Sequence, residues 1–355
     1  MSRFFSDRYS SLIPYVPGEQ PKNTKYIKLN TNESPYPPSP ATIAAATAEA
    51  SQLELYSDPE CSKLTKKAAE YYGVSERNVI MTNGSDEVLN FAFMAFCDST
   101  HPIAFADITY GFYPVFANLN GIPYRTLKLT SDLRIDVSDY IGTKENVVIA
   151  NPNAPTGIAL PLSDIEAIIA SNPDRVVIID EAYVDFGGES AVPLTLKYDN
   201  LLVTQTFSKS RSMAGARLGV GIGNEKLIAD LNTIKYSTNP YNVNRMTCAA
   251  GYAALCDDEY YKYNCSLISK SREYLHRELE ALGFVHTPSL ANFVFAKSNK
   301  ISGEELYTKL KEKGILVRHF DTDRISDYNR ITVGSKEECE ALVAAIKEIF
   351  KEKDI

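Results

Sequence analysis

The chain has 355 residues, of which 44% are hydrophobic and 23% charged, a composition typical of a folded globular protein of about two domains. Its formal net charge of −8 argues against nucleic acid as the main partner, because binding to a phosphate backbone needs a clustered basic surface. The N-terminus lacks the continuous apolar stretch of a signal peptide and no segment approaches the ~18 apolar residues of a membrane span, so we predict a cytoplasmic protein without a membrane partner.

The chain is predicted to begin with an extended arm. Residues 1–40 are rich in Pro, Ser and Asn ("LNTNESPYPPSP"), which is typical of turns. Helices are expected over "ATIAAATAEAS" and over "ECSKLTKKAAEYYG", with Gly73 ending the second. "NVIMTNGS" is predicted as a strand that runs into a turn, and "DEVLNFAFMAFC" as the apolar helix that follows.

The middle of the chain carries the pattern of a parallel sheet. Short β-rich runs recur at "PIAFAD", "YRTLKL", "ENVVIANP", "RVVIIDEAY", "LLVTQTFS" and "RLGVGIG", and most are separated by helical or turn segments. This alternation predicts an α/β fold, with a mostly parallel sheet flanked by helices. We assign this large domain to residues 41–250.

After residue 250 the pattern changes. A long helical stretch around residues 245–275 is followed by "NFVFAK", "ILVRHF", "RITVGS" and the amphipathic helix "KEECEALVAAIKEIF". We predict that residues 251–355 form a linking helix and a smaller α+β domain, to which the N-terminal arm contributes.

Residues that follow the predicted strands are the candidates for a site, because ligands bind at the carboxyl ends of parallel strands. Ser85 follows the strand at 79–82 as a predicted N-cap, and the helix behind it offers free N–H groups to an anion. Asp180 ends a second strand, and Lys209 follows a third, eight residues before Arg217. Taken singly, the serine could be an ordinary helix cap and the aspartate a magnesium ligand.

Other cofactors fit the sequence less well. A magnesium-binding aspartate of a nucleotide hydrolase needs a G-x-x-x-x-G-K-[ST] loop, which the chain lacks. "GVGIG" at 219–223 does not have the G-x-G-x-x-G spacing, and its glycines are expected to let a strand pass close to another segment. The six cysteines form no C-x-x-C pair and no zinc-like spacing with the histidines, so we predict no metal site.

One cofactor would use the whole set of strand-end residues. Pyridoxal phosphate has a phosphate, a ring nitrogen and an aldehyde. A lysine forms a Schiff base with the aldehyde, and a carboxylate keeps the ring nitrogen protonated so that the ring accepts electrons. An anion-binding helix start, Asp180, Lys209 and Arg217 therefore predict a pyridoxal-phosphate site.

Several motifs resemble those of the fold type I pyridoxal-phosphate aminotransferases. They are "NPNAPTG" (151–157), "DEAY" (180–183), "FSKS" with "AGARLG" (207–219) and "RITVG" (330–334). The arm pattern "KLNTNESPYPPSP", with "YSDPE", "NGSDE" and "ITYGFY", is similar to the histidinol-phosphate aminotransferase branch. The resemblance, which begins near residue 12, implies a transaminase that passes an amino group between a phosphorylated amino alcohol and 2-oxoglutarate.

The resemblance also implies residue roles. Lys209 would hold the cofactor and move the proton, Asp180 would pair with the ring nitrogen, and Tyr183 would bind the ring's phenolic oxygen. Tyr110 would stack on the ring. The residues expected around the phosphate are Ser85, Asp86, Thr206, Ser208 and Arg217. Tyr56 would reach the phosphate of the neighbouring subunit, which implies a homodimer with shared sites, although a surface tyrosine in a turn is the alternative.

One position departs from the family pattern. An asparagine usually stands directly before "PTG", where its amide contacts the phenolic oxygen, but here that position is Ala154. Either Asn153 takes the contact through a shifted loop or Tyr183 works alone. We favour Asn153, because an oxygen that shares charge with the cofactor should not lack a donor.

Two arginines are candidates for substrate binding. Arg318 and Arg330 stand in apolar β-runs, and the resemblance supports an anion clamp over the alternative of surface salt bridges. A guanidinium can bind a substrate phosphate in one half-reaction and a glutamate carboxylate in the other. Tyr15 and Asn292 are predicted as further polar contacts.

Other functions remain open at this point. The same cofactor would serve an aromatic amino-acid aminotransferase or a threonine-phosphate decarboxylase. A non-catalytic cofactor-binding regulator is disfavoured, because no basic helix-turn-helix precedes the enzyme-like region and Lys209 is intact. The expected partners are therefore a small-molecule amino donor and a 2-oxo acid acceptor.

Overall fold

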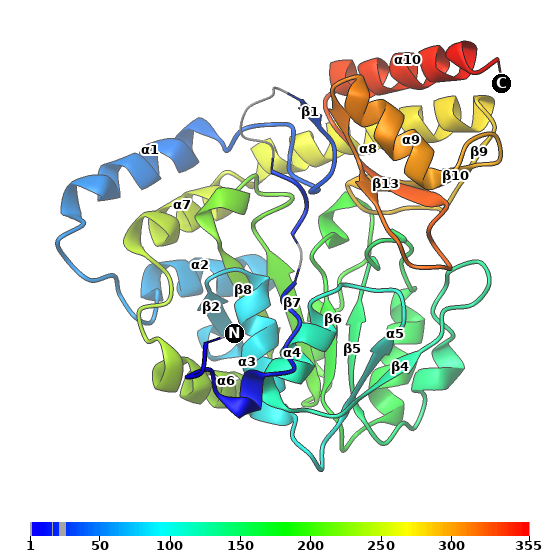
Figure 1. Ribbon diagram of the computed structural model, residues 1–355. Helices are drawn as coiled ribbons and strands as arrows, with labels where there is room; N and C mark the ends of the chain where they lie inside the picture. Colours follow the sequence, from blue (N-terminus) through cyan, green and yellow to red (C-terminus); the bar gives the residue numbers. More distant parts are fainter. Residues whose placement is uncertain (1, 16, 21–25, 355) are drawn as a thin grey trace.

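The computed structural model describes residues 2–15, 17–20 and 26–354, and a seven-stranded sheet forms its centre (Figure 1). The strands are β2 (Val79–Thr82), β3 (Ile103–Ala106), β4 (Tyr124–Leu127), β5 (Asn146–Ala150), β6 (Val177–Asp180), β7 (Leu201–Thr206) and β8 (Gly219–Gly223). They lie in the order β2-β8-β7-β6-β5-β3-β4. β8 is antiparallel to both its neighbours, whereas the other pairs are parallel. The predicted mostly parallel sheet is confirmed.

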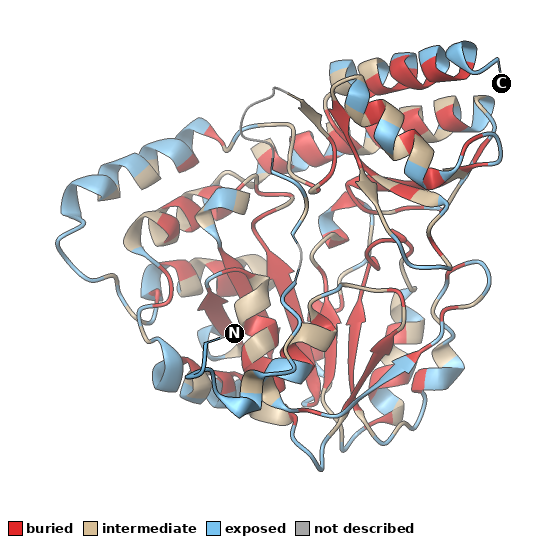
Figure 2. Cartoon of the chain, in the orientation of Figure 1, coloured by how far each residue is buried: buried red, intermediate tan, exposed pale blue. Residues whose placement is uncertain are grey.

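Helices cover both faces of this sheet. One face carries α2 (Ser62–Tyr72), α5 (Leu162–Ser171) and α7 (Arg245–Cys256), and the other carries α3 (Ser85–Phe96), α4 (Tyr113–Asn120) and α6 (Glu225–Thr238). Every residue of β5, β6 and β7 is buried, and Figure 2 shows these strands between helices that are exposed on their outer sides. Burial on both faces explains the continuous runs of Val and Ile in the strands. Within the described ranges, no helix is long and apolar enough to cross a membrane.

A second, smaller sheet is antiparallel and lies beside the C-terminal helices (Figure 1). Its strands, in spatial order, are β12 (Arg318–His319), β13 (Tyr328–Thr332), β10 (Phe293–Ser298) and β9 (Phe284–His286). The accompanying helices are α8 (Asp258–Ala281), α9 (Gly303–Glu312) and α10 (Lys336–Glu352). The arm joins this part through β1 (Ile27–Lys28), which pairs in parallel with β11 (Ile315–Leu316), as expected. α1 (Pro40–Glu49) lies along α7. The domain bounds at residues 40 and 250 stay a prediction.

The C-terminal end of α2 and the N-terminal end of α3 can be compared with the residues predicted to cap them. α2 ends at Gly73 with φ +69°, as predicted. The prediction that Ser85 is the N-cap of α3 is wrong, because Gly84 is the N-cap and Ser85 is the first helical residue. Gly84 has φ +83°, and a Cβ there would lie 2.7 Å from Arg217 Nη2. The positive φ, which side chains other than glycine rarely adopt, therefore favours glycine at this position over a capping side chain.

Candidate active site

A cavity opens at the carboxyl ends of the central parallel strands, where the sequence predicted a site. Its lining residues are Ser85, Asp86, Tyr110, Ala150, Pro152, Ala154, Asp180, Ala182, Tyr183, Thr206, Ser208, Lys209 and Arg217. Apart from Asn153 and Tyr56, every residue predicted to contact the cofactor is in this set. The fold therefore brings together segments that are far apart in the sequence.

Asp180 is the last residue of β6 and is only 4% exposed. Its Oδ2 accepts a hydrogen bond of 2.8 Å from Tyr113 Oη, and its Oδ1 accepts one of 3.3 Å from the N–H of Ala182. Burial removes water from the carboxylate and raises the pKa of Asp180 to about 6, and the negative charge of Asp86 acts in the same direction. A cation placed in the cavity, such as a protonated ring nitrogen, would stabilise the charged form.

Tyr113 is a site residue that sequence reasoning missed. It opens α4, is fully buried and holds the Asp180 carboxylate in place. The signal was present in the quoted motif "ITYGFY", where Tyr113 is the final residue. Because Tyr110 precedes it by three residues, both rings can lie near the start of one helix, and their centroids are 5.6 Å apart.

The start of α3 forms an anion cradle. No side chain caps the helix, and Ser85 and Asp86 of its first turn line the cavity, where the free N–H groups and the positive end of the helix dipole favour an anion. Arg217 closes the cradle: its Nη2 lies 3.2 Å from Asp86 Oδ2, and its Nη1 lies 3.4 Å from Ser208 Oγ. Tyr110 Oη donates to Asp86 Oδ1 at 2.8 Å.

Gly219 explains how a strand can run beneath this cradle. A Cβ on Gly219 would lie 2.3 Å from Ser85 N and from the carbonyl carbon of Gly84. Such contacts are impossible, so β8 needs glycine where it passes the helix start. The expectation that the "GVGIG" glycines permit a close approach is confirmed.

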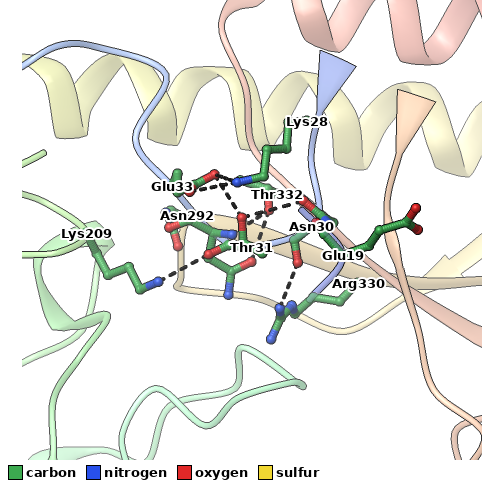
Figure 3. Close-up of polar contacts among 10 residues, drawn as sticks. Glu19, Lys28, Asn30, Thr31, Glu33, Lys209, Asn292, Arg330 and Thr332 are labelled. Carbon is green, nitrogen blue, oxygen red and sulfur yellow. Dashed lines mark hydrogen bonds and ion pairs between the residues drawn. The ribbon is translucent and has the colours of Figure 1, made fainter. Parts of the chain in front are cut away.

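Lys209 reaches from the end of β7 toward the arm (Figure 3). Its Nζ donates to the carbonyl oxygen of Thr31 at 3.3 Å and lies 5.8 Å from the ring centroid of Tyr183. The hydroxyl of Tyr183 accepts a hydrogen bond of 2.9 Å from Asn32 Nδ2. The amine thus lies between the arm and the phenol, within the first cavity.

A second cavity adjoins the first and shares Tyr110, Ala154, Tyr183 and Lys209 with it. Three of the predicted substrate residues line it, namely Tyr15, Arg318 and Arg330. Asn292, the fourth, does not: it is fully buried and donates from Nδ2 to the carbonyl oxygen of Asn32 at 2.9 Å.

The two arginines pack against aromatic rings. Arg330 Cζ lies 5.4 Å from the Phe293 centroid and 5.8 Å from that of Phe320, and Arg318 Cζ lies 5.6 Å from Phe320. Arg330 Nη2 donates to the carbonyl oxygen of Asn30 at 3.1 Å (Figure 3). Burial lowers the pKa of Arg330, so an anion bound beside it would be favourable.

Asn153 lies outside both cavities. Its Nδ2 donates to Ile108 O at 3.0 Å and to Thr156 Oγ1 at 3.1 Å, and its Oδ1 accepts from Thr109 Oγ1 at 2.7 Å. With its amide used within the loop, the structure does not bring Asn153 to the site as we expected. Ala154 lines the cavity in its place.

Tyr56 also lies away from the cavity of its own chain. It is 83% exposed and its ring stacks on that of Tyr241, with centroids 4.7 Å apart. The structure of one chain therefore leaves its role in a neighbouring subunit a prediction.

The residues of the first cavity fit pyridoxal phosphate. A buried carboxylate lies at one point of the lining, an uncapped helix start with an arginine at another, and a lysine amine at a third. These groups complement a ring nitrogen, a phosphate and an aldehyde respectively.

Comparison with known proteins agrees with this geometry. The family model of the class I and II aminotransferases matches residues 24–346. The chain is 48% identical over 350 residues to histidinol-phosphate aminotransferase 1 of Bradyrhizobium diazoefficiens, covering 99% of this chain and 100% of that protein. It is 49% identical over 353 residues to the histidinol-phosphate aminotransferase of Brachyspira hyodysenteriae, with the same coverage. The fold is shared with the pyridoxal-5'-phosphate complex of the Sinorhizobium meliloti histidinol-phosphate aminotransferase, with a TM-score of 0.90 at 24% identity over 99% of each chain.

Proposed function

The chain belongs to the class I and II aminotransferases, in their histidinol-phosphate aminotransferase branch, and on this premise we propose that it transfers the amino group of histidinol phosphate to 2-oxoglutarate. This is a step of histidine biosynthesis. The observation that carries the proposal is a cavity containing Lys209 and Asp180 that opens into a second one with two arginines. The full-length relatives favour this activity over aromatic transamination and threonine-phosphate decarboxylation.

Pyridoxal phosphate, the cofactor of this family, takes up the amino group of the donor and releases it to the acceptor. Asp180 would hold a proton on the ring nitrogen, because a buried carboxylate pairs strongly with a cation. Ser85, Thr206, Ser208 and Arg217 would bind the phosphate together with the start of α3. Tyr110 would cover the ring face.

Lys209 would act twice. Its amine would hold the cofactor when substrate is absent, and once the substrate amine had displaced it, the freed amine would take the proton from the substrate carbon that bears the amino group. The Thr31 carbonyl oxygen, 3.3 Å from Nζ, gives the free amine a hydrogen-bond acceptor at the border of the two cavities. Tyr183 would donate to the cofactor's phenolic oxygen.

Arg318 and Arg330 would bind the substrate anions. The aromatic rings beside them pack against the guanidinium groups, and an apolar surface beside a charge strengthens an ion pair with a bound anion. Tyr15 lines the same cavity, and Asn292 would act indirectly by fixing the backbone of Asn32.

We expect kcat/KM to be far higher for histidinol phosphate than for histidinol, with phenylalanine and tyrosine weaker substrates. Arg330→Lys should lower kcat/KM in both half-reactions by roughly 10–100-fold, since losing a bidentate charged contact costs about 1.5–3 kcal/mol. Arg318→Lys should affect the phosphate substrate more than glutamate. Side-by-side measurement of kcat/KM for histidinol phosphate and phenylalanine checks both statements. If phenylalanine were the better substrate and Arg330→Lys had no effect, the substrate assignment would fall while the cofactor chemistry stood.

We also propose a homodimer in which Tyr56 binds the phosphate of the partner's site. The exposure of its ring, together with exposed Leu53 and Leu55 nearby, supports a contact with a second chain. Mixing inactive Lys209→Ala protein with impaired Tyr56→Ala protein should then restore part of the activity, because heterodimers contain one intact site. Sedimentation and proof of subunit exchange are the controls, and exchange without recovered activity would contradict a shared site.

A further inference from the structure

Asn32 is the arm residue whose side chain reaches the core of the site. Its Nδ2 donates a hydrogen bond of 2.9 Å to Tyr183 Oη, and Tyr183 lines both cavities. Asn32 is only 1% exposed, although it is a polar residue on an N-terminal arm. A buried amide is favourable only when its donors and acceptors have partners.

The orientation of this amide is fixed by Thr332, the last residue of β13. The backbone N–H of Asn32 donates to Thr332 Oγ1 at 2.9 Å, and the Thr332 hydroxyl donates to Asn32 Oδ1 at 3.1 Å. Since Oδ1 is engaged by Thr332, the NH₂ group faces Tyr183. Figure 3 shows Thr332 and Asn292 beside the arm.

The backbone of Asn32 is also held in an unusual conformation. Its φ is +55°, in the left-handed region that asparagine tolerates better than most residues other than glycine. Asn292 Nδ2 holds the Asn32 carbonyl oxygen at 2.9 Å. Two buried side chains therefore fix the position of Asn32: Thr332 in β13, and Asn292 in the loop just before β10.

The hydrogen bond from Asn32 determines what the Tyr183 hydroxyl can do. A phenol has one proton to donate and accepts through its oxygen. Because Oη accepts from Asn32, its own proton is left for another acceptor, and in the described part of the chain this hydroxyl has no second protein partner. The remaining direction is the cavity that Tyr183 shares with Lys209.

We propose that Asn32 is a positioning residue that makes Tyr183 a donor toward the phenolic oxygen of pyridoxal phosphate. The inference rests on the proposed function and extends it to a residue of the arm. This role of Asn32 also explains how the site can have Ala154 where the family usually has asparagine. Tyr183 then supplies the hydrogen-bond donor that the side chain of Ala154 lacks.

Two substitutions at Asn32 separate the hydrogen bond from the backbone conformation. Asn32→Asp keeps the size and the contact with Thr332 but replaces the donor by a negatively charged acceptor, so the Tyr183 proton turns away from the cavity and the site gains a charge. Asn32→Gly keeps the left-handed backbone and removes the side chain. The readout is the pH midpoint of the visible absorbance of the protein reconstituted with pyridoxal phosphate.

We expect this midpoint to rise by roughly one pH unit in Asn32→Asp and by less in Asn32→Gly. A donor to the phenolic oxygen stabilises the form with more negative charge, which dominates at high pH, so losing the donor moves the midpoint upward. Tyr183→Phe should shift it at least as far as Asn32→Gly does, and adding the uncharged Asn32→Gly to Tyr183→Phe should have no further effect.

The matched control is Lys311→Ala, at an ion pair of the arm. It removes the contact of 2.8 Å with Glu19, which lies outside both cavities, and should leave the midpoint unchanged. An unshifted Asn32→Asp protein of normal thermal stability would overturn the proposal, as would an added shift when Asn32→Gly is combined with Tyr183→Phe. If the wild-type protein bound no pyridoxal phosphate, the proposed function would fall and this inference with it.

Discussion

Replacing Lys209 by alanine is expected to abolish transamination, with a loss on the order of 10⁴-fold or more. The variant should also fail to hold pyridoxal phosphate covalently, so that the yellow colour disappears on dialysis. Both effects follow from the position of the amine, which lines the cavity together with Asp180 and Arg217. Absorbance after dialysis, and mass spectrometry after borohydride reduction, measure the attachment directly.

An exposed lysine provides the control. Lys197 lies outside both cavities and pairs with Glu166 at 2.6 Å, so Lys197→Ala should keep both colour and activity. A colourless wild-type protein after incubation with excess cofactor would contradict the assignment. So would a Lys209→Ala protein that retained the cofactor through dialysis and reduction.

Replacing Asp180 by asparagine or alanine should slow each half-reaction by about 10²–10⁴-fold at saturating cofactor. Covalent attachment to Lys209 should persist, because a neutral side chain removes the partner of the ring nitrogen and leaves the amine in place. Stopped-flow absorbance of a single half-reaction measures this rate. Glu181→Gln is the matched control. Glu181 is the next residue in the chain and is also buried, but it does not line the cavity, so its replacement should leave the rate of the half-reaction unchanged. Wild-type rates for Asp180→Ala would exclude the assigned role.

Asp180 should also lower the free energy of unfolding of the cofactor-free protein at neutral pH. Burial raises the pKa of Asp180 to about 6, compared with about 4 in an unfolded chain, so the folded state binds this proton more tightly. Asp180 therefore does not lower the free energy of unfolding below about pH 4, and its full effect is reached above about pH 6. A pKa difference of about two corresponds to about 2–3 kcal/mol. Asp180→Asn should raise the Tm of the cofactor-free protein at pH 8 but not at pH 4.

The fold was predictable because its signals are local. Buried parallel strands appear as short runs of Val and Ile, and glycine ends α2 through its backbone alone. The cofactor residues were predictable for a related reason: Asp180 and Lys209 follow two such strands, and parallel strands place their carboxyl ends at one edge. None of these features depends on a contact between particular side chains far apart in the sequence.

The direction of a side chain depends on distant partners and was less predictable. Asn153 and Ala154 are neighbours, yet the carbonyl oxygen of Ile108 and the Thr109 hydroxyl engage the asparagine and only the alanine lines the cavity. Asn32 stands in a motif that we quoted, but its contact with Tyr183 joins residues 151 positions apart. Such pairings are decided by tertiary packing, which no local pattern encodes.

The contact between Asn32 and Thr332 spans 300 residues and has a consequence for synthesis of the chain. A ribosome completes all strands of the large sheet when β8 emerges, but the arm made first must wait for the last strand, β13, before its buried polar groups find partners. Contacts this distant are slow to form because a long loop must close first. We therefore expect the arm of the nascent chain to stay open to proteases and chaperones until β13 has emerged, and a chain that stops before β13 to be degraded rather than to accumulate.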